Sequence, residues 1–253
     1  MVKFTLVLSG LLVTLTAAAS QPSYQVISDV DDTLKYANIQ NKLAAGWNGL
    51  FTSKEFAGSS EYMQAVVDAQ AKVNFVSSTP EWLRGKINRF IKKHGFPDTR
   101  VFLKKKMSDD TYTYKTAKVA EVAGEGSEPL VLIGDDVEVD AEAFTDFAKQ
   151  NPSRVAAVYI RRVRNRALPS GAIPFTTFFE VALREYLAGR IELDGLASVA
   201  SAVLQAKHKL VVPRFGSCAS PQSALATDDL TRTLESMVND RVVQVCRDHK
   251  HRN

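Results

Sequence analysis

The sequence predicts an α/β fold in which a mainly parallel β-sheet lies between two layers of helices. Short apolar runs alternate with amphipathic helical patterns from residue 25 to residue 187. Parallel strands need a crossover connection, so this alternation favours a sheet that is covered by helices on both faces. The chain has 253 residues, of which 45% are apolar and 24% charged. A chain of this size and composition can bury a large core.

The expected strands are short and end in polar residues, which is typical of buried strands that open into loops. They cover residues 26–28, 73–76, 101–103, 130–133 and 155–160. The helices between them are expected at 59–72, 81–94, 115–123, 139–150 and 178–187. In the first helix, Val67 is expected on the apolar face. In the helix after Pro80, Trp82 shares a spacing near 3.6 residues with other apolar side chains, which predicts that it faces the core.

Two further amphipathic patterns follow the main alternation, at residues 193–210 and 228–245. We expect them to form a helical C-terminal extension (191–253) on a main domain that covers residues 21–190. The only two cysteines, Cys218 and Cys246, lie in this extension. They match no zinc motif, and in an oxidising compartment they could form a disulfide, with two unpaired thiols as the alternative.

Residues 1–20 are typical of a cleavable signal peptide. Lys3 precedes an apolar run that ends in three alanines, and small residues are what a signal peptidase requires. The run is shorter than the ~20 residues that span a bilayer, although an uncleaved anchor is the alternative. We therefore expect cleavage after Ala19 or Ser20, a secreted or periplasmic protein, and no transmembrane span in the mature chain.

The formal net charge of +4 fits an anionic substrate or surface but indicates no nucleic-acid partner, since no nucleic-acid-binding motif is present. Two basic segments are candidates for attracting an anionic bilayer or substrate, namely 161–166 and Lys104–Lys106. The alternative for both is a solvated loop. The sequence leaves the oligomeric state open.

Polar residues stand where ligands bind in open α/β sheets, at the carboxyl ends of the expected strands. These residues are Asp29, Asp31, Ser77, Lys115, Asp135 and Asp140. Each type suits phosphoryl transfer. One carboxylate can attack phosphorus, and a second can move a proton. A hydroxyl and an ammonium can hold the phosphoryl oxygens, and further carboxylates can hold Mg²⁺.

The order of these residues resembles the four motifs of the haloacid-dehalogenase superfamily. Asp-Val-Asp-Asp-Thr at 29–33 is similar to the first motif, Ser77 and Lys115 to the second and third, and Gly134-Asp135 with Asp140 to the fourth. The finer pattern resembles the actin-patch-type phosphatidate phosphatase catalytic domain, which is related to lipins. It is carried over about residues 25–165 by four segments: 28–35, 76–83, 95–97 with 103–104, and 132–135.

The resemblance implies a Rossmann-like three-layer fold and a role for each motif residue. Asp29 would be the nucleophile and a Mg²⁺ ligand, and Asp31 the general acid and base, with a backbone carbonyl on the metal. The other implied roles are metal binding by Asp135 and Asp140, phosphate binding by Ser77, Ser78 and Lys115, and support of the nucleophile loop by Thr33. Asp136 replaces the family's usual serine and is expected to add negative charge beside the metal, so we expect a substrate preference that differs from the family's.

The implied function is Mg²⁺-dependent hydrolysis of phosphomonoesters through an aspartyl-phosphate, with phosphatidate as one candidate substrate. Soluble or protein-borne phosphates, and a catalytically silent binding module of the same fold, are the alternatives. The gap between the first two motifs leaves room for at most a minimal cap, so we expect an open site. Trp47 and Phe51 in this gap are expected either at a lipid surface or in the core.

Overall fold

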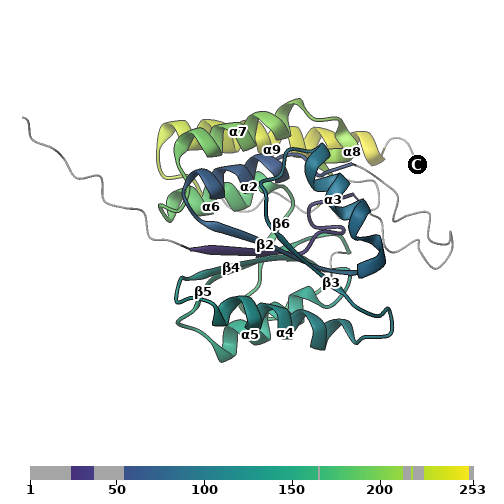
Figure 1. Ribbon diagram of the computed structural model, residues 1–253. Helices are drawn as coiled ribbons and strands as arrows, with labels where there is room; N and C mark the ends of the chain where they lie inside the picture. The colour runs from purple at the N-terminus through teal and green to yellow at the C-terminus, as the bar shows by residue number, and fades with distance from the viewer. Residues whose placement is uncertain (1–23, 37–53, 165, 213–217, 219–224, 251–253) are drawn as a thin grey trace, which may run out of the picture.

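The structure is a computed structural model that describes residues 24–36, 54–164, 166–212, 218 and 225–250. The predicted signal peptide lies outside these residues, as do Trp47 and Phe51. Figure 1 shows a twisted sheet between two helical layers. The predicted α/β fold with a parallel sheet is therefore confirmed.

The described sheet has six strands in the order β3-β2-β1-β4-β5-β6, and each neighbouring pair is parallel. Its strands are β1 (Gln25–Ser28), β2 (Lys72–Pro80), β3 (Arg100–Lys104), β4 (Leu130–Asp135), β5 (Val155–Arg161) and β6 (Ile173–Phe175). The chain runs outward from β1 in one direction and then outward from β4 in the other. The reversal lies between β1 and β4, where open sheets bind ligands.

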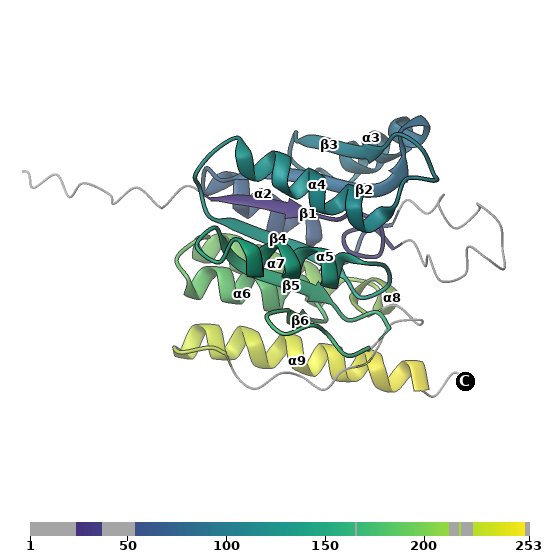
Figure 2. The same cartoon turned by 90° about the horizontal axis from the view of Figure 1, so that it is seen from below.

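Helices α4 (Thr111–Gly124) and α5 (Asp140–Gln150) cover one face of the sheet. The other face carries most of the remaining helices (Figures 1 and 2). These are α2 (Ser59–Asp68), α3 (Arg84–Lys93), α6 (Phe178–Leu187), α7 (Leu193–Gln205) and α9 (Asp229–Lys250). Two short segments complete the described elements, η3 (Glu81–Leu83) and α8 (His208–Val211).

Alternating side chains of the central strands fill two separate cores, because successive residues of a strand point to opposite faces. Val26 of β1 packs under α2 and α6, whereas Ile27 packs against α4 and α5. Likewise, Ile133 of β4 belongs to the first core and Leu132 to the second. Both faces of the central strands are thus buried, which explains their continuous apolar runs.

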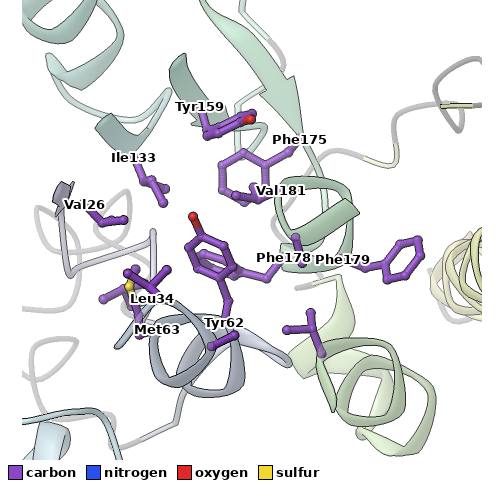
Figure 3. Packing of buried hydrophobic residues seen from close by; sticks show 14 of the residues in the cluster. Val26, Leu34, Tyr62, Met63, Ile133, Tyr159, Phe175, Phe178, Phe179 and Val181 are labelled. Atoms are coloured by element: carbon purple, nitrogen blue, oxygen red, sulfur yellow. The ribbon is translucent and has the colours of Figure 1, made fainter. Parts of the chain in front are cut away.

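The first core joins the C-terminal helices to the main domain. Figure 3 shows Tyr62 of α2 beside Phe178 of α6, and their ring centroids are 5.7 Å apart. Val199 of α7 and Val242 of α9 belong to the same buried cluster. The expected extension therefore packs onto the sheet's first face and does not stand apart from it.

Leu34 ends the turn that follows β1, and its side chain lies in this core (Figure 3). It fixes one end of the loop that carries the first motif.

Several local expectations were wrong. Helix α2 ends at Asp68, and Val67 is exposed. Trp82 is also exposed, because the chain makes a 3₁₀ turn after Pro80 before the α-helix begins. The three-residue strand β6 has no matching expectation, since a run this short that contains Pro174 carries little pattern. Among the described residues, none of the helices has the length and apolarity that crossing a membrane requires.

Candidate active site

The loop after β1 forms a tight turn that is held by backbone hydrogen bonds. The N–H of Asp29 donates to the carbonyl of Ile133 on β4, with a nitrogen–oxygen distance of 2.8 Å. The carbonyl of Val30 accepts from both Leu34 and Lys35. Asp32 takes a left-handed φ of 59°, a conformation that Asp tolerates better than most residues. This turn places Asp29 and Asp31 at the edge of the sheet.

The fourth motif brings two carboxylates to the same edge. Asp135 ends β4, and Asp140 begins α5. Gly134 permits this close approach, because a Cβ on it would lie 2.5 Å from the Cβ of Asp140. The Asp135 carboxylate accepts from the backbone N–H of Val137 and from the Thr33 hydroxyl. The contact from Thr33 connects the loop after β1 to β4.

Lys115 joins these two motifs from the third. Helix α4 begins at Thr111, earlier than expected, and the Asp110 side chain caps it by accepting from the N–H of Thr113. The buried Lys115 Nζ donates to Asp29 Oδ1 at 2.8 Å and also to Asp140 Oδ1. Three motifs that are distant in the sequence thus meet at one ammonium group.

The carboxylates of Asp29, Asp135 and Asp140 form a buried cluster, with ligand oxygens that all lie within 4.8 Å of one another. Opposite ligands of a Mg²⁺ ion are about 4.2 Å apart, so this spacing is close to what such an ion requires. The buried Oδ2 of Asp29 has no hydrogen-bond partner among the described residues. A buried carboxylate oxygen without a partner is unfavourable, and the charge of a cation held by this cluster would stabilise it. The donor set therefore fits Mg²⁺.

Electrostatics also favour a further cation in this cluster. Burial raises the pKa of the Asp29 carboxyl well above its usual range, although Lys115 acts in the opposite direction. Burial and the nearby Asp140 and Asp29 raise the pKa of Asp135 in the same way. For Lys115, burial lowers the pKa, but Asp140 and Asp29 outweigh it and the net shift is upward. One ammonium does not balance three buried carboxylates, and added positive charge would stabilise their ionised form.

Asp31 points to a different set of partners. Its Oδ2 accepts from the Thr79 hydroxyl at 2.7 Å and from Ser77 at 3.4 Å, and its Oδ1 accepts from Lys35 Nζ at 3.2 Å. All four side chains are buried. The sequence reasoning assigned no role to Thr79 or Lys35. Two signals could have found them: Lys35 lies four residues after Asp31, and Thr79 follows the Ser77-Ser78 pair at the end of β2.

Two candidate residues have contacts that differ from the expected ones. Ser78 donates to Glu138 Oε2 at 2.8 Å, so its hydroxyl is turned to the fourth-motif loop. Asp136 accepts from the backbone N–H groups of Val163 and Arg164, both at 2.7 Å. The sequence predicts its charge beside the metal, whereas in the structure this carboxylate binds the loop after β5.

Two arginines of the basic run 161–166 make contacts with other parts of the protein. Arg161 is buried, with its guanidinium 3.8 Å from the ring centroid of Phe56. Arg166 binds Glu142 and two backbone carbonyls of the fourth-motif loop. Arg164 is exposed. The expectation of a basic surface at this run is therefore wrong for Arg161 and Arg166.

In the other basic segment, Lys104 is buried and donates to Thr111, whereas Lys105 and Lys106 are exposed. Cys218 and Cys246 form a disulfide that ties the described residue 218 to α9.

Comparison with known proteins agrees with this geometry. The family model of the catalytic domain of phosphatidate phosphatase APP1 matches residues 24–162, which is more than half of the chain. A curated relative, the uncharacterized protein C29B5.04c of Schizosaccharomyces pombe, is 24% identical over 150 residues. The match covers 54% of this chain but only 25% of that relative.

A solved structure, that of a Pnkp1/Rnl/Hen1 complex, is 20% identical with a TM-score of 0.37. The match covers 66% of this chain and 52% of that one.

The matched residues 24–162 include all four motifs that meet at the carboxylate cluster. The family's described activity is that of a phosphoric monoester hydrolase, in agreement with the enzyme class that the sequence predicts. The chain belongs to the family of phosphatidate phosphatase APP1 catalytic domains.

Proposed function

We propose that this protein is a Mg²⁺-dependent phosphatidate phosphatase that works through an aspartyl-phosphate on Asp29. One observation carries the proposal. Lys115 holds one oxygen of Asp29, and the other oxygen has no hydrogen-bond partner among the described residues, inside a cluster of three carboxylates. A carboxylate fixed in this way can present a free oxygen to phosphorus.

The cation would be held by Asp29, Asp135 and Asp140, together with the backbone carbonyl of Asp31. When bound, Mg²⁺ supplies positive charge that offsets the repulsion between these carboxylates and the phosphate group. Lys115 contributes further positive charge next to Asp29, and the Ser77 hydroxyl contacts Asp31 at the same edge of the sheet. We assign both to the phosphoryl oxygens, where fixed donors stabilise the charge of the transition state.

In the first step, an oxygen of Asp29 attacks phosphorus and the bond between phosphorus and the alcohol oxygen breaks. The electron pair goes to the leaving oxygen, which takes a proton from Asp31. In the second step, Asp31 accepts a proton from water, and the water oxygen attacks phosphorus. Inorganic phosphate leaves, and Asp29 regains its carboxylate. Lys35 and Thr79 keep the Asp31 carboxyl in one position during both steps.

We also propose that the mature enzyme acts outside the cytosol. The pattern of residues 1–20 supports this location, and so does the disulfide between Cys218 and Cys246, since such bonds persist in oxidising compartments.

The direct test is turnover of phosphatidate in detergent micelles, and of a soluble aryl phosphate, with Mg²⁺ and with a chelator. Asp29→Asn removes the nucleophile, and we expect its kcat to fall by on the order of a thousandfold or more. Asp146→Asn is the matched control, because this carboxylate on the same helix as Asp140 binds Tyr112 and Lys149 outside the cluster. Wild-type turnover that is equal in chelator, or full activity of Asp29→Asn, would contradict the proposal. Turnover of the aryl phosphate alone would instead favour soluble substrates.

A further inference from the structure

The two most exposed large apolar side chains of the described residues lie at the edge of the sheet that holds the carboxylate cluster. They are Trp82, with 67% of its surface exposed, and Met107, with 55%. Trp82 follows β2, and Met107 follows β3. These strands are neighbours, and the pairing of Pro80 with Lys104 brings their carboxyl ends together. Figure 1 shows both strands ending on the side of the molecule where α3 and α4 begin.

The exposure of Trp82 is built into the chain. The 3₁₀ turn at Glu81–Leu83 buries Leu83 and turns Trp82 outward. Arg84 holds this turn in place, because it pairs with Glu81 and donates to the carbonyl of Val101 on β3. Because this turn keeps the Trp82 side chain exposed, the fold lacks the stabilisation that burial of a tryptophan would provide. The exposed Trp82 side chain is therefore a candidate for burial when the protein binds a partner surface.

The loop of Met107 adds positive charge to the same place. Lys105 and Lys106 are exposed, and the N–H of Lys106 donates to Asp109, which orders the loop. The Asp110 carboxylate beside them is engaged in capping α4. After β5, by contrast, Arg161 and Arg166 make contacts within the protein, with Phe56 and Glu142 respectively.

We propose that Trp82, Lys105, Lys106 and Met107 form a docking face for an anionic lipid bilayer. The face combines an amphipathic ring, a flexible apolar side chain and two ammonium groups. This combination suits the interfacial region of a membrane with negatively charged headgroups. Its position at the same edge of the sheet would bring the carboxylate cluster close to the headgroup layer. The inference rests on the proposed function, because it supplies the route by which a membrane-bound phosphate ester reaches Asp29.

The test is sedimentation with vesicles of phosphatidylcholine, with and without a minority of phosphatidate. Asp29→Asn serves as the background, so that the lipid is not consumed. We expect this protein to bind the vesicles that contain phosphatidate, more weakly as salt rises. Lys105→Glu with Lys106→Glu should weaken partitioning about tenfold or more. Trp82→Ala with Met107→Ala should weaken it by a similar factor of about ten.

Leu230→Ala with Met237→Ala is the matched control. These α9 side chains are 52% and 48% exposed, and α9 begins at the opposite end of the sheet (Figure 2). The control should bind vesicles like the parent. If it weakens binding as much as the docking-face variants, or if those variants bind normally, the proposal is overturned. It is equally overturned if Trp82→Ala converts a dimer to a monomer while vesicle binding is unchanged, since the face would then join two copies of the chain.

Fluorescence supplies a second readout that does not depend on activity. The chain has two tryptophans, so a Trp47→Phe background reports Trp82 alone. Its emission should shift to the blue when vesicles with phosphatidate are added, and an unchanged spectrum would contradict the docking face. Turnover of a soluble aryl phosphate by protein with native Asp29 separates the two proposals. Turnover without vesicle binding would contradict only the docking face. Vesicle binding without turnover would contradict only the proposed enzyme activity.

Discussion

At the scale of single residues, the position of Asp31 depends on side chains to which the sequence pattern assigns no role. Thr79 and Lys35 contact its two carboxylate oxygens, and all three residues are buried. A hydrogen bond to a charged group contributes about 1.5–3 kcal/mol. The Asp31 carboxyl therefore depends on Thr79 for its orientation as well as on its own backbone.

Thr79→Val removes the hydroxyl but keeps the shape of the side chain. We expect kcat on a soluble aryl phosphate to fall about 10- to 100-fold with little change in KM, because the proton-transferring carboxyl loses one anchor. Thr79→Ser should restore most of the rate, and a urea unfolding curve should separate this effect from a loss of stability. A change in KM alone, or no rescue by serine, would contradict a positioning role for Thr79.

The motif residues could be predicted from the sequence because strand ends in a parallel sheet share one edge. The contacts of Asp136 and Ser78 could not be predicted, because they depend on where the loops after β4 and β5 lie relative to each other. The same limit applies to Arg161 and Arg166. Charge in a sequence does not reveal whether a guanidinium faces water or a buried ring.

At the scale of elements, the site depends on how closely α5 follows β4. Periodicity located these elements to within a few residues, because both carry strong apolar patterns. It did not locate the 3₁₀ turn after Pro80, since a single turn changes which side chain faces the core without changing the composition. It also did not locate the break between α7 and α8, which lies within a continuous apolar pattern.

Gly134→Ala tests the close approach of β4 and α5. The added Cβ would lie 2.5 Å from the Asp140 Cβ, so Asp140 must move away from Lys115 and Asp135. We expect a loss of about 1–3 kcal/mol in the free energy of unfolding, together with a larger loss of turnover. Gly85→Ala in α3 is the control, because its new Cβ would meet nothing within 4 Å. A Gly134→Ala protein with wild-type turnover would show that the approach is not needed.

At the scale of the whole molecule, the fold concentrates the chemistry at one edge of the sheet. Residue 29 lies in the loop directly after β1, and residues 77, 115, 135 and 140 lie in β2, α4, β4 and α5. The parallel arrangement directs them to the same place. The helices α7 and α9 pack onto the first core, far from the second face that carries α4 and α5. The architecture thus separates stabilising contacts from the groups that are available for catalysis.

The proposed mechanism requires that Asp29 becomes covalently phosphorylated. The most direct measurement is acid quenching of the enzyme during turnover of phosphatidate labelled in its phosphate group, followed by mass analysis of its peptides. We predict label on the peptide that contains Asp29, dependent on Mg²⁺ and absent from Asp29→Asn. Steady turnover with no labelled protein at any quench time, or label on another residue, would contradict the account.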